Sequence, residues 1–194
     1  MARTDVQLML DVQAGDEESF ATLLRKYRTP VVNFLYRMVR DSAAAEDLAQ
    51  EVFLRVYRAR QGYAPSAKFT TWMFRIATNL ALNSLRDNHH RQLEISMDQT
   101  VEMNEGEQPA LEVPDRRPTA EQQLLARSRT EMIRNAIYGL PEKQRAAVLL
   151  HKYQELDYDE IAKILGCSES ALKSLLFRAY ETLRIQLEPL VRPQ

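Results

Sequence analysis

Residues 157–183 read DYDEIAKILGCSESALKSLLFRAYETL, and they contain two helical patterns separated by one glycine. Asp157 with Glu160 three residues later resembles a capping box, which favours the start of a helix at this point. Gly166 is a residue that ends helices, and Ser168 is suited to cap the next one. The spacing therefore predicts two short helices joined by a tight turn, which is the helix-turn-helix arrangement.

The second of these helices has two distinct faces. Its inward stripe at helical spacing consists of Leu172, Leu176, Ala179 and Leu183. The opposite face is polar and basic and consists of Ser170, Lys173, Ser174, Phe177 and Arg178. Such a face suits the DNA major groove, where Lys and Arg bind phosphate or guanine, Ser forms hydrogen bonds and Phe contacts a thymine methyl. A helical hairpin with an ordinary solvated face is the alternative interpretation.

The rest of the chain also has helical periodicity, and no strand-like alternation extends beyond a few residues. Residues 92–120 differ, because they contain three prolines and seven carboxylates with almost no apolar periodicity. The sequence therefore predicts an all-α fold with two small helical domains, residues 1–91 and 121–194. A flexible acidic linker, residues 92–120, joins them.

Individual helices follow from the same periodicity and from capping residues. In the first domain we expect helices over residues 6–14, 17–27, 31–39, 42–60 and 69–86, with Pro30 opening the third and a loop over residues 61–68. Phe20, Leu23 and Leu24 are expected to face inward. In the second domain we expect a helix over residues 121–138 and another that begins at Pro141, before the helix-turn-helix.

The net charge of −1 hides an uneven distribution. Residues 1–91 hold 13 basic against 10 acidic side chains, residues 92–120 hold 2 against 7, and residues 121–194 hold 11 against 10. No acidic residue occurs between Val52 and Arg86, where the basic residues are Arg55, Arg58, Arg60, Lys68, Arg75 and Arg86. This local basic surface is compatible with a nucleic-acid partner.

Aromatic residues are interleaved with these basic residues, a pattern typical of single-stranded DNA binding because unstacked bases stack on aromatic rings. Phe53 and Trp72 lie on apolar stripes and suit the core. Tyr63 lies in the Gly/Pro loop, where we expect it to be exposed. Asn79 and Asn83 lie four residues apart on one helical face and can hydrogen-bond base edges.

An acidic and amide face, formed by Glu46, Asp47, Gln50 and Glu51, precedes this stretch. Such a face repels DNA, so it indicates either a protein partner or a merely solvated surface. The chain has no Gly-rich phosphate loop, nucleophile elbow or HExxH pair, and adjacent His89 and His90 are poor joint metal ligands. We therefore expect no enzymatic activity, no cofactor and no metal. The single Cys167, with no signal peptide or membrane-length apolar run, indicates a cytoplasmic protein without membrane insertion.

Two blocks of motifs, one before the acidic linker and one after it, resemble a known family in their order along the chain. Residues 47–53 (DLAQEVF) and 69–79 (FTTWMFRIATN) precede the acidic linker, and Leu140-Pro141 and residues 156–162 (LDYDEIA) follow it. This order resembles a bacterial RNA polymerase sigma factor of the extracytoplasmic-function (ECF) type, over nearly the whole chain. The resemblance implies a transcription initiation factor that binds promoter DNA and the polymerase core, through the β′ clamp helices and the β flap.

The resemblance also implies roles for particular residues. Asp47, Gln50 and Glu51 correspond to the surface that docks on the β′ clamp helices. The first domain would bind and melt the minus-ten element through Tyr63, Lys68, Trp72, Arg75, Asn79 and Asn83. The second would bind the minus-thirty-five duplex through Ser170, Lys173, Ser174, Phe177 and Arg178. The family commonly has Arg where this chain has Leu175, and often Arg at Lys173 as well. Leu cannot donate a hydrogen bond and Lys cannot make the bidentate contact with guanine, so phosphate contact is the expectation for Lys173.

An anti-sigma factor is a further partner that the resemblance implies. Two other functions remain open at this point. A stand-alone helix-turn-helix repressor or activator would need a dimer interface or a sensor domain, and an enzyme with an attached DNA-binding domain would need a catalytic constellation.

Overall fold

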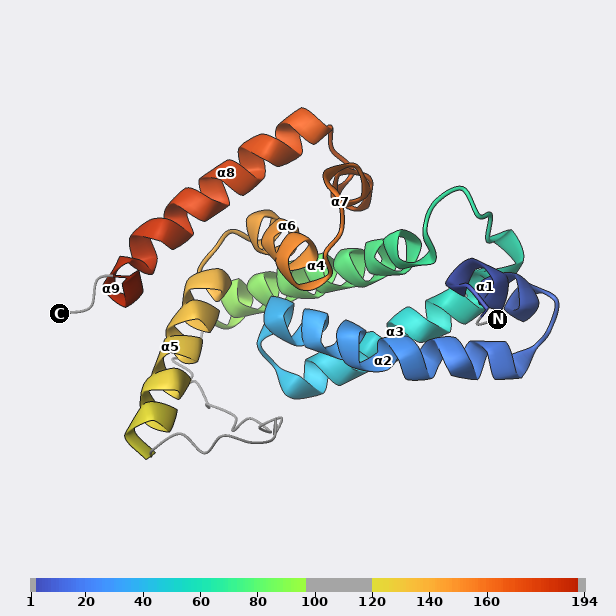
Figure 1. The fold of residues 1–194 in the computed structure, drawn as a ribbon, viewed down its shortest axis with the longest axis horizontal. Coiled ribbons are helices and arrows are strands. Elements are labelled where there is room, and N and C mark those ends of the chain that lie inside the picture. The colour runs from blue at the N-terminus through green and yellow to red at the C-terminus, as the bar shows by residue number, and fades with distance from the viewer. Residues whose placement is uncertain (1–2, 97–119, 192–194) are drawn as a thin grey trace.

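The computed structural model describes residues 3–96 and 120–191, and this part of the chain contains only helices and connecting loops (Figure 1). The first group of helices is α1 (Asp5–Gln13), α2 (Glu17–Val39), α3 (Ser42–Arg58), the 3₁₀ helix η1 (Ala59–Gly62) and α4 (Phe69–Ser96). The second group is α5 (Ala120–Tyr138), α6 (Glu142–Tyr153), α7 (Tyr158–Leu165), α8 (Glu169–Gln186) and α9 (Glu188–Val191). The predicted all-α class is confirmed. Most of the predicted linker, residues 97–119, lies outside the described residues.

Helix α2 differs from the prediction, because Pro30 lies inside it and does not begin a separate helix. A proline in a helix interior costs about 3 kcal/mol. The buried stripe Leu23, Tyr27, Val31 and Leu35 nevertheless continues at four-residue spacing through the proline. Each such side chain contributes about 1.5–3 kcal/mol on burial, so the continuous stripe outweighs the local cost. Helix α4 also continues beyond the predicted end at Arg86.

Helix α2 is the centre of the first group, since it packs against α1, α3 and α4. The rings of Phe34 on α2 and Phe74 on α4 meet edge to face, with centroids 5.4 Å apart. Helix α1 begins with a capping box between Thr4 and Gln7. The side-chain amide of its last residue, Gln13, donates to the backbone carbonyl of Gln61 at 2.8 Å, and the side-chain amide of Gln61 donates to the carbonyl of Gln13 at 3.2 Å. These two hydrogen bonds connect α1 to η1.

The predicted helix-turn-helix is formed by α7 and α8. The backbone N–H of Asp157 donates to the carboxylate of Glu160 at 3.1 Å, as the capping pattern predicted. Gly166 ends α7 with φ +64°, a left-handed conformation that favours glycine. Ser168 Oγ then accepts a hydrogen bond from Ala171 N at 3.2 Å and caps α8. The inward stripe Leu172, Leu176, Ala179 and Leu183 is buried, so this local prediction is confirmed.

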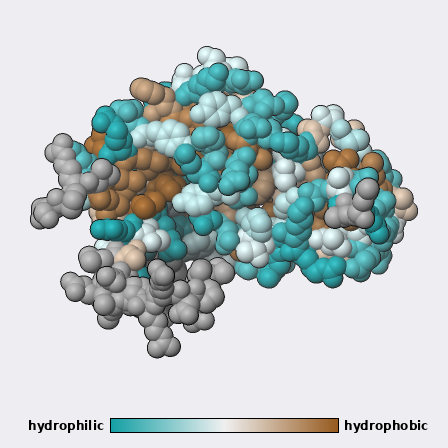
Figure 2. Space-filling model, viewed as in Figure 1, coloured by the Kyte–Doolittle hydropathy of each residue, from teal (hydrophilic) through white to brown (hydrophobic). Residues whose placement is uncertain are grey.

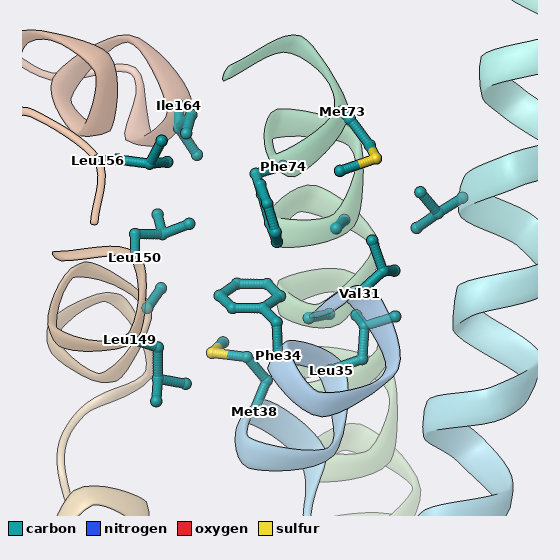
Figure 3. Close-up of a cluster of buried hydrophobic side chains, with 14 of the residues drawn as sticks. Val31, Phe34, Leu35, Met38, Met73, Phe74, Leu149, Leu150, Leu156 and Ile164 are labelled. Carbon is teal, nitrogen blue, oxygen red and sulfur yellow. The ribbon is translucent and has the colours of Figure 1, made fainter. Parts of the chain in front are cut away.

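The two groups of helices share a hydrophobic core. Helix α4 packs against α7, and α2 packs against α6. In Figure 3, Phe34 and Met38 from α2 and Phe74 from α4 face Leu149 and Leu150 from α6. Leu156 and Ile164 continue this surface toward the helix-turn-helix. All of these side chains are buried, so the two groups stabilise each other by direct apolar contact.

Polar contacts reinforce this junction at the end of α2. Arg145, a buried arginine on α6, donates hydrogen bonds to the carbonyls of Met38 and of Tyr138 and Leu140. Arg40 follows α2 and forms an ion pair with Glu131 of α5 at 3.2 Å. The Met38 carbonyl therefore has a charged donor from the second group, which links the last turn of α2 to α6.

The left-handed conformation of Gly166 gives a testable prediction. Gly166→Ala places a Cβ where φ is +64°, and we expect the free energy of unfolding to fall by about 1–2 kcal/mol. Gly139→Ala is the matched control, since its Cβ would meet only carbonyl oxygens at 3.5 and 3.6 Å, which is ordinary contact. Urea denaturation measures both, and an equal loss in the two variants would contradict this account of the turn.

The shared core gives a second prediction. Phe34 is 1% exposed, and Phe34→Ala should lower the free energy of unfolding by about 3–5 kcal/mol through lost burial and a residual cavity. Phe177→Ala removes the same atoms at a position that is 67% exposed, so it should change stability by less than about 0.5 kcal/mol. Thermal and urea unfolding of the two variants provide the comparison. Similar stabilities would show that Phe34 is not the packing centre described here.

Candidate nucleic-acid and protein interfaces

Helix α8 presents its predicted DNA face to solvent. Ser170, Lys173, Ser174, Phe177 and Arg178 are all exposed, on the side opposite the buried stripe. Ser174 Oγ donates to the carbonyl of Ser170 at 3.1 Å, and Arg178 Nε donates to that of Ser174 at 3.3 Å. Phe177 is 67% exposed although it is a large apolar residue. Leu175, in contrast, is half-buried and packs against the core, so the position where the family commonly has Arg serves packing in this chain.

Helix α4 carries a second polar stripe. Arg75, Asn79 and Asn83 are exposed and follow each other at four-residue spacing, so they lie on one face of the helix. Trp72 begins this stripe and is half-buried, with its ring 5.1 Å from that of Tyr63 and 6.1 Å from that of Phe69. The predicted minus-ten residues of α4 therefore lie together, with cationic and amide groups next to an accessible indole.

Tyr63 is buried, and the expectation that it is exposed in its loop was wrong. It is 6% exposed, and its hydroxyl has no hydrogen-bond partner. The 3₁₀ helix η1 turns the chain so that the Tyr63 ring packs against Phe69 and Trp72 at the start of α4. Burial, together with the nearby charge of Asp5, raises the pKa of Tyr63. The composition of the loop could not reveal this, because the burial depends on rings that lie in the next helix.

Lys68 occupies the start of α4 and already has partners. Its ammonium group lies 3.2 Å from the carboxylate of Glu160 and 3.8 Å from that of Asp157. The hydrogen bond with Glu160 raises the pKa of Lys68, and the charge of that carboxylate adds to the effect. Both carboxylates belong to the helix-turn-helix, so one predicted minus-ten residue is bound by the second group of helices.

The acidic face of α3 is accessible. Asp47 and Gln50 are exposed, whereas Glu51 forms an ion pair with Arg55 at 2.6 Å. A groove between α2 and α3 lies beside this face and is mainly apolar. Its apolar lining consists of Phe20, Leu24, Ala49, Phe53, Leu54 and Tyr57. Ion-paired Arg28 and Glu46 lie at its edge, 3.1 Å apart.

Sequence reasoning missed this groove. Phe20 and Leu24 pack against the core, in line with the expectation that they face inward, but they are only half-buried and also line the groove. Leu54 is 48% exposed and falls outside the buried stripe Val52, Phe53 and Val56. An apolar residue on the polar side of an otherwise clear helical stripe was the available signal.

The second group of helices has an exposed apolar surface of its own. Figure 2 shows hydrophobic residues gathered on the side of the molecule where α5 and α8 face each other. Met132 and Ile133 on α5 and Ile185 on α8 are exposed. Exposed apolar patches of this kind mark protein-interaction surfaces more often than isolated apolar residues do.

Among residues 3–89 and 126–190, whose side chains the structure describes, no group of three or more His, Cys, Asp or Glu side chains is arranged to hold a metal ion. His151 Nδ1 instead lies 2.7 Å from the Tyr180 hydroxyl. None of the helices within residues 3–96 and 120–191 is long and apolar enough to cross a membrane.

The sequence matches two domain families that correspond to the two groups of helices. Residues 23–91 match Sigma-70 region 2, and residues 130–183 match Sigma-70, region 4. These matches cover the helices that carry the α3 face, the α4 stripe and the helix-turn-helix.

Two solved structures have a similar fold. CnrH in complex with the cytosolic domain of CnrY is 18% identical, with a TM-score of 0.64 and coverage of 93% of this chain and 95% of that one. The sigma factor RpoE in complex with the anti-sigma factor NepR from Bartonella quintana is 22% identical. Its TM-score is 0.65, with coverage of 88% of this chain and 98% of that one.

Curated relatives match almost end to end. The RNA polymerase sigma-H factor of Pseudomonas aeruginosa is 32% identical over 189 residues, which cover 97% of this chain and 96% of the relative. The ECF RNA polymerase sigma-E factor of Escherichia coli is also 32% identical over 189 residues, with 97% of each chain covered. With this identity over nearly all of both chains, the protein belongs to the ECF family of RNA polymerase sigma factors.

Proposed function

We propose that residues 1–91 bind the polymerase core and the minus-ten promoter element, and that residues 121–194 bind the minus-thirty-five element. As a sigma factor, the protein directs promoter-specific initiation by the polymerase core and is not itself an enzyme. The interpretations as a stand-alone helix-turn-helix regulator and as an enzyme with a DNA-binding domain are therefore set aside. Action in the cytoplasm, where the polymerase acts, is part of the same proposal.

The exposed face of α8 is the observation that carries the DNA-binding proposal. Its scaffold is a buried stripe and two capped helices, so the orientation of the face is fixed by packing. Lys173 and Phe177 both project from this face into solvent. We propose that Lys173 binds a backbone phosphate and that Phe177 contacts a base methyl in the major groove.

For the minus-ten element, the proposal uses α4 and the aromatic cluster beside it. Arg75, Asn79 and Asn83 provide one cation and two amides along an exposed stripe. Trp72 provides a partly accessible ring for stacking with an unpaired base. Because Tyr63 is buried in the free chain, its proposed contact with a base requires the loop before α4 to rearrange. Lys68 likewise has to leave Glu160 before it binds DNA.

For the polymerase, we propose docking at two apolar surfaces. The groove between α2 and α3, flanked by Asp47 and Gln50, suits the β′ clamp helices, since it combines apolar contact with carboxylate and amide groups at its edge. The exposed apolar residues of α5 and α8 suit the β flap. Regulation by an anti-sigma factor is the further proposal, supported by the partner with which the similarly folded RpoE of Bartonella quintana was crystallised.

The polymerase contact is tested by the triple variant Asp47→Ala, Gln50→Ala, Glu51→Ala. We expect the parent to give promoter-specific transcripts with bacterial core polymerase on a promoter library, and the variant to lose core binding and transcription together. Glu18→Ala with Asp87→Ala removes two exposed carboxylates elsewhere on the first group of helices and should retain both activities. Failure of the parent to bind core or initiate at any promoter would contradict the proposed function.

The role of Lys173 is tested by its salt dependence. Lys173→Ala should weaken binding of the holoenzyme to promoter DNA about equally across minus-thirty-five sequences and reduce the slope of log K against log salt by about 1. Lys143→Ala removes an exposed lysine of α6 and should leave the slope unchanged. A change in sequence preference with an unchanged slope would instead indicate that Lys173 binds a base.

A further inference from the structure

Tyr63 is the proposed minus-ten residue that the fold keeps away from solvent. It is 6% exposed, and its ring lies 5.1 Å from that of Trp72 and 6.5 Å from that of Phe69. Under the proposed function this ring contacts an unpaired base, so it has to leave its buried position. The contacts that hold Tyr63 in place therefore determine how readily the minus-ten contact forms.

The burial of Tyr63 is not favourable for every part of its side chain. Its ring gains apolar contact with Phe69 and Trp72, but its hydroxyl is buried without a hydrogen-bond partner. A buried polar group without a partner is unfavourable, and the hydroxyl would regain one in water or on DNA. Because these two effects oppose each other, the position of the ring depends on the backbone that carries it.

That backbone follows the 3₁₀ helix η1. The Tyr63 N–H donates to the Arg60 carbonyl at 3.2 Å, at the end of this helix. None of the four residues of η1 is buried, so the helix contributes little apolar packing of its own. Short 3₁₀ helices also have poorer hydrogen-bond geometry than α-helices. The position of η1 therefore depends on its contacts with other helices of the first group.

Helix α1 supplies such a contact, and Figure 1 shows it beside the loop that precedes α4. Gln13 Nε2 donates to the Gln61 carbonyl at 2.8 Å, and Gln61 Nε2 donates to the Gln13 carbonyl at 3.2 Å. The last carbonyls of a helix have no partner within the helix, so that of Gln13 is available to accept. Arg60 also stacks on the Tyr57 ring at 4.1 Å, but Tyr57 belongs to α3, from which η1 continues. The Gln13–Gln61 pair thus attaches η1 to a helix that is distant in sequence.

Helix α1 is itself held firmly against α2 and can serve as the fixed partner of this pair. Its buried residues are Leu8, Met9 and Val12. Near its start, Asp5 accepts hydrogen bonds from Tyr27 Oη and Lys26 Nζ of α2, each at 2.6 Å. Loss of the Gln13–Gln61 pair would therefore release η1 and leave α1 in place. All of these contacts lie within the first group of helices, so they do not depend on the position of the second group.

We propose that Gln13 and Gln61 are positioning residues for minus-ten recognition, because their reciprocal hydrogen bonds hold η1 where Tyr63 is buried. Release of the pair allows the Tyr63 ring to leave Phe69 and Trp72 and to contact a base. The contact with a base rests on the proposed function, whereas the hold on Tyr63 rests on the contacts alone. Only molecules in which Tyr63 is exposed form this contact, so the apparent Kd is the intrinsic Kd divided by their fraction.

Two substitutions weaken the pair without removing a proposed DNA contact. Gln13→Ala removes the donor to the Gln61 carbonyl, and Gln61→Ala removes the donor to the Gln13 carbonyl. Gln7→Ala is the matched control, since Gln7 lies on the same helix and its side chain accepts a hydrogen bond from Thr4 N at 2.9 Å. That hydrogen bond lies at the start of α1, away from η1. Circular dichroism verifies that each variant is folded.

The first measurement is hydrogen exchange of the Tyr63 amide in the full chain, followed by NMR. The amide exchanges when its hydrogen bond to Arg60 opens, so its exchange rate under native conditions reports the open fraction. Gln13→Ala and Gln61→Ala should raise this rate about two- to tenfold, since each loses one hydrogen bond between neutral groups. Gln7→Ala should leave it unchanged. An unchanged rate in both Gln13→Ala and Gln61→Ala would overturn the hold on Tyr63.

The second measurement follows the ring itself. Trp72 is the only tryptophan in the chain, and the Tyr63 ring packs against it. In the double variant Gln13→Ala, Gln61→Ala, departure of that ring exposes the indole, so quenching of its fluorescence by acrylamide should increase. The Gln7→Ala variant should be quenched to the same extent as the parent. Faster amide exchange without increased quenching would show that the backbone opens with the ring still buried, and would overturn the proposal.

The third measurement is DNA binding by holoenzymes assembled with each variant. The probe is a fluorescent single strand that carries the minus-ten element of a promoter transcribed by the parent holoenzyme. Gln13→Ala and Gln61→Ala should raise the affinity by the factor by which they raise the exchange rate, and Gln7→Ala should not. In a Tyr63→Ala background, where the ring is absent, Gln13→Ala should have no effect on affinity. A purely structural role of Gln13 would not produce this dependence on Tyr63.

The outcomes separate the inference from the proposed function. Faster exchange with unchanged or lower affinity would overturn the positioning role of Gln13 and Gln61 and leave the sigma function intact. Failure of the parent holoenzyme to transcribe any promoter would instead remove the proposed function, while exchange and quenching in the full chain still report the hold on Tyr63.

Discussion

The apolar contact between α2, α4 and α6 is the constraint on which the rest of the structure depends. Phe34 and Phe74 meet edge to face and are covered by Leu149 and Leu150 from the second group of helices. Because this core lies between the two groups, it positions the helix-turn-helix against α4. The ion pairs of Lys68 with Glu160 and Asp157 depend on that position.

Local structure in this chain could be predicted because its signals are local. The capping residues Asp157, Gly166 and Ser168 specify α7 and α8 within a few residues, and the buried stripe of α8 follows directly from its spacing. The exposed α8 face is therefore visible in the sequence. Pro30 shows the limit of such rules, since a stripe that continues on both sides of the proline overrides its effect on the helix.

Tertiary contacts account for what the sequence could not show. Tyr63 is buried by rings of the following helix. Lys68 forms an ion pair with the carboxylate of Glu160, a residue 92 positions away along the chain. Glu160 looked like a capping residue alone, yet it also accepts hydrogen bonds across the domain junction. The groove between α2 and α3 was missed for a similar reason, because it forms only where the two helices pack together, and its one signal within α3 was the exposed Leu54. The ECF family, in contrast, could be predicted from the order and spacing of motifs in the sequence, and the 32% identity to curated relatives over nearly the whole chain shows the membership.

The central claim is that two surfaces, one on α4 and one on α8, bind two separate promoter elements. Replacement of Trp72 or Phe177 by a photoreactive phenylalanine analogue in the holoenzyme, followed by irradiation on promoter DNA, tests it most directly. The account predicts that position 72 cross-links to the minus-ten element and position 177 to the minus-thirty-five duplex, about one and a half helical turns upstream. Cross-links from both positions to the same element, or from position 177 to no duplex upstream of the minus-ten element, would contradict it.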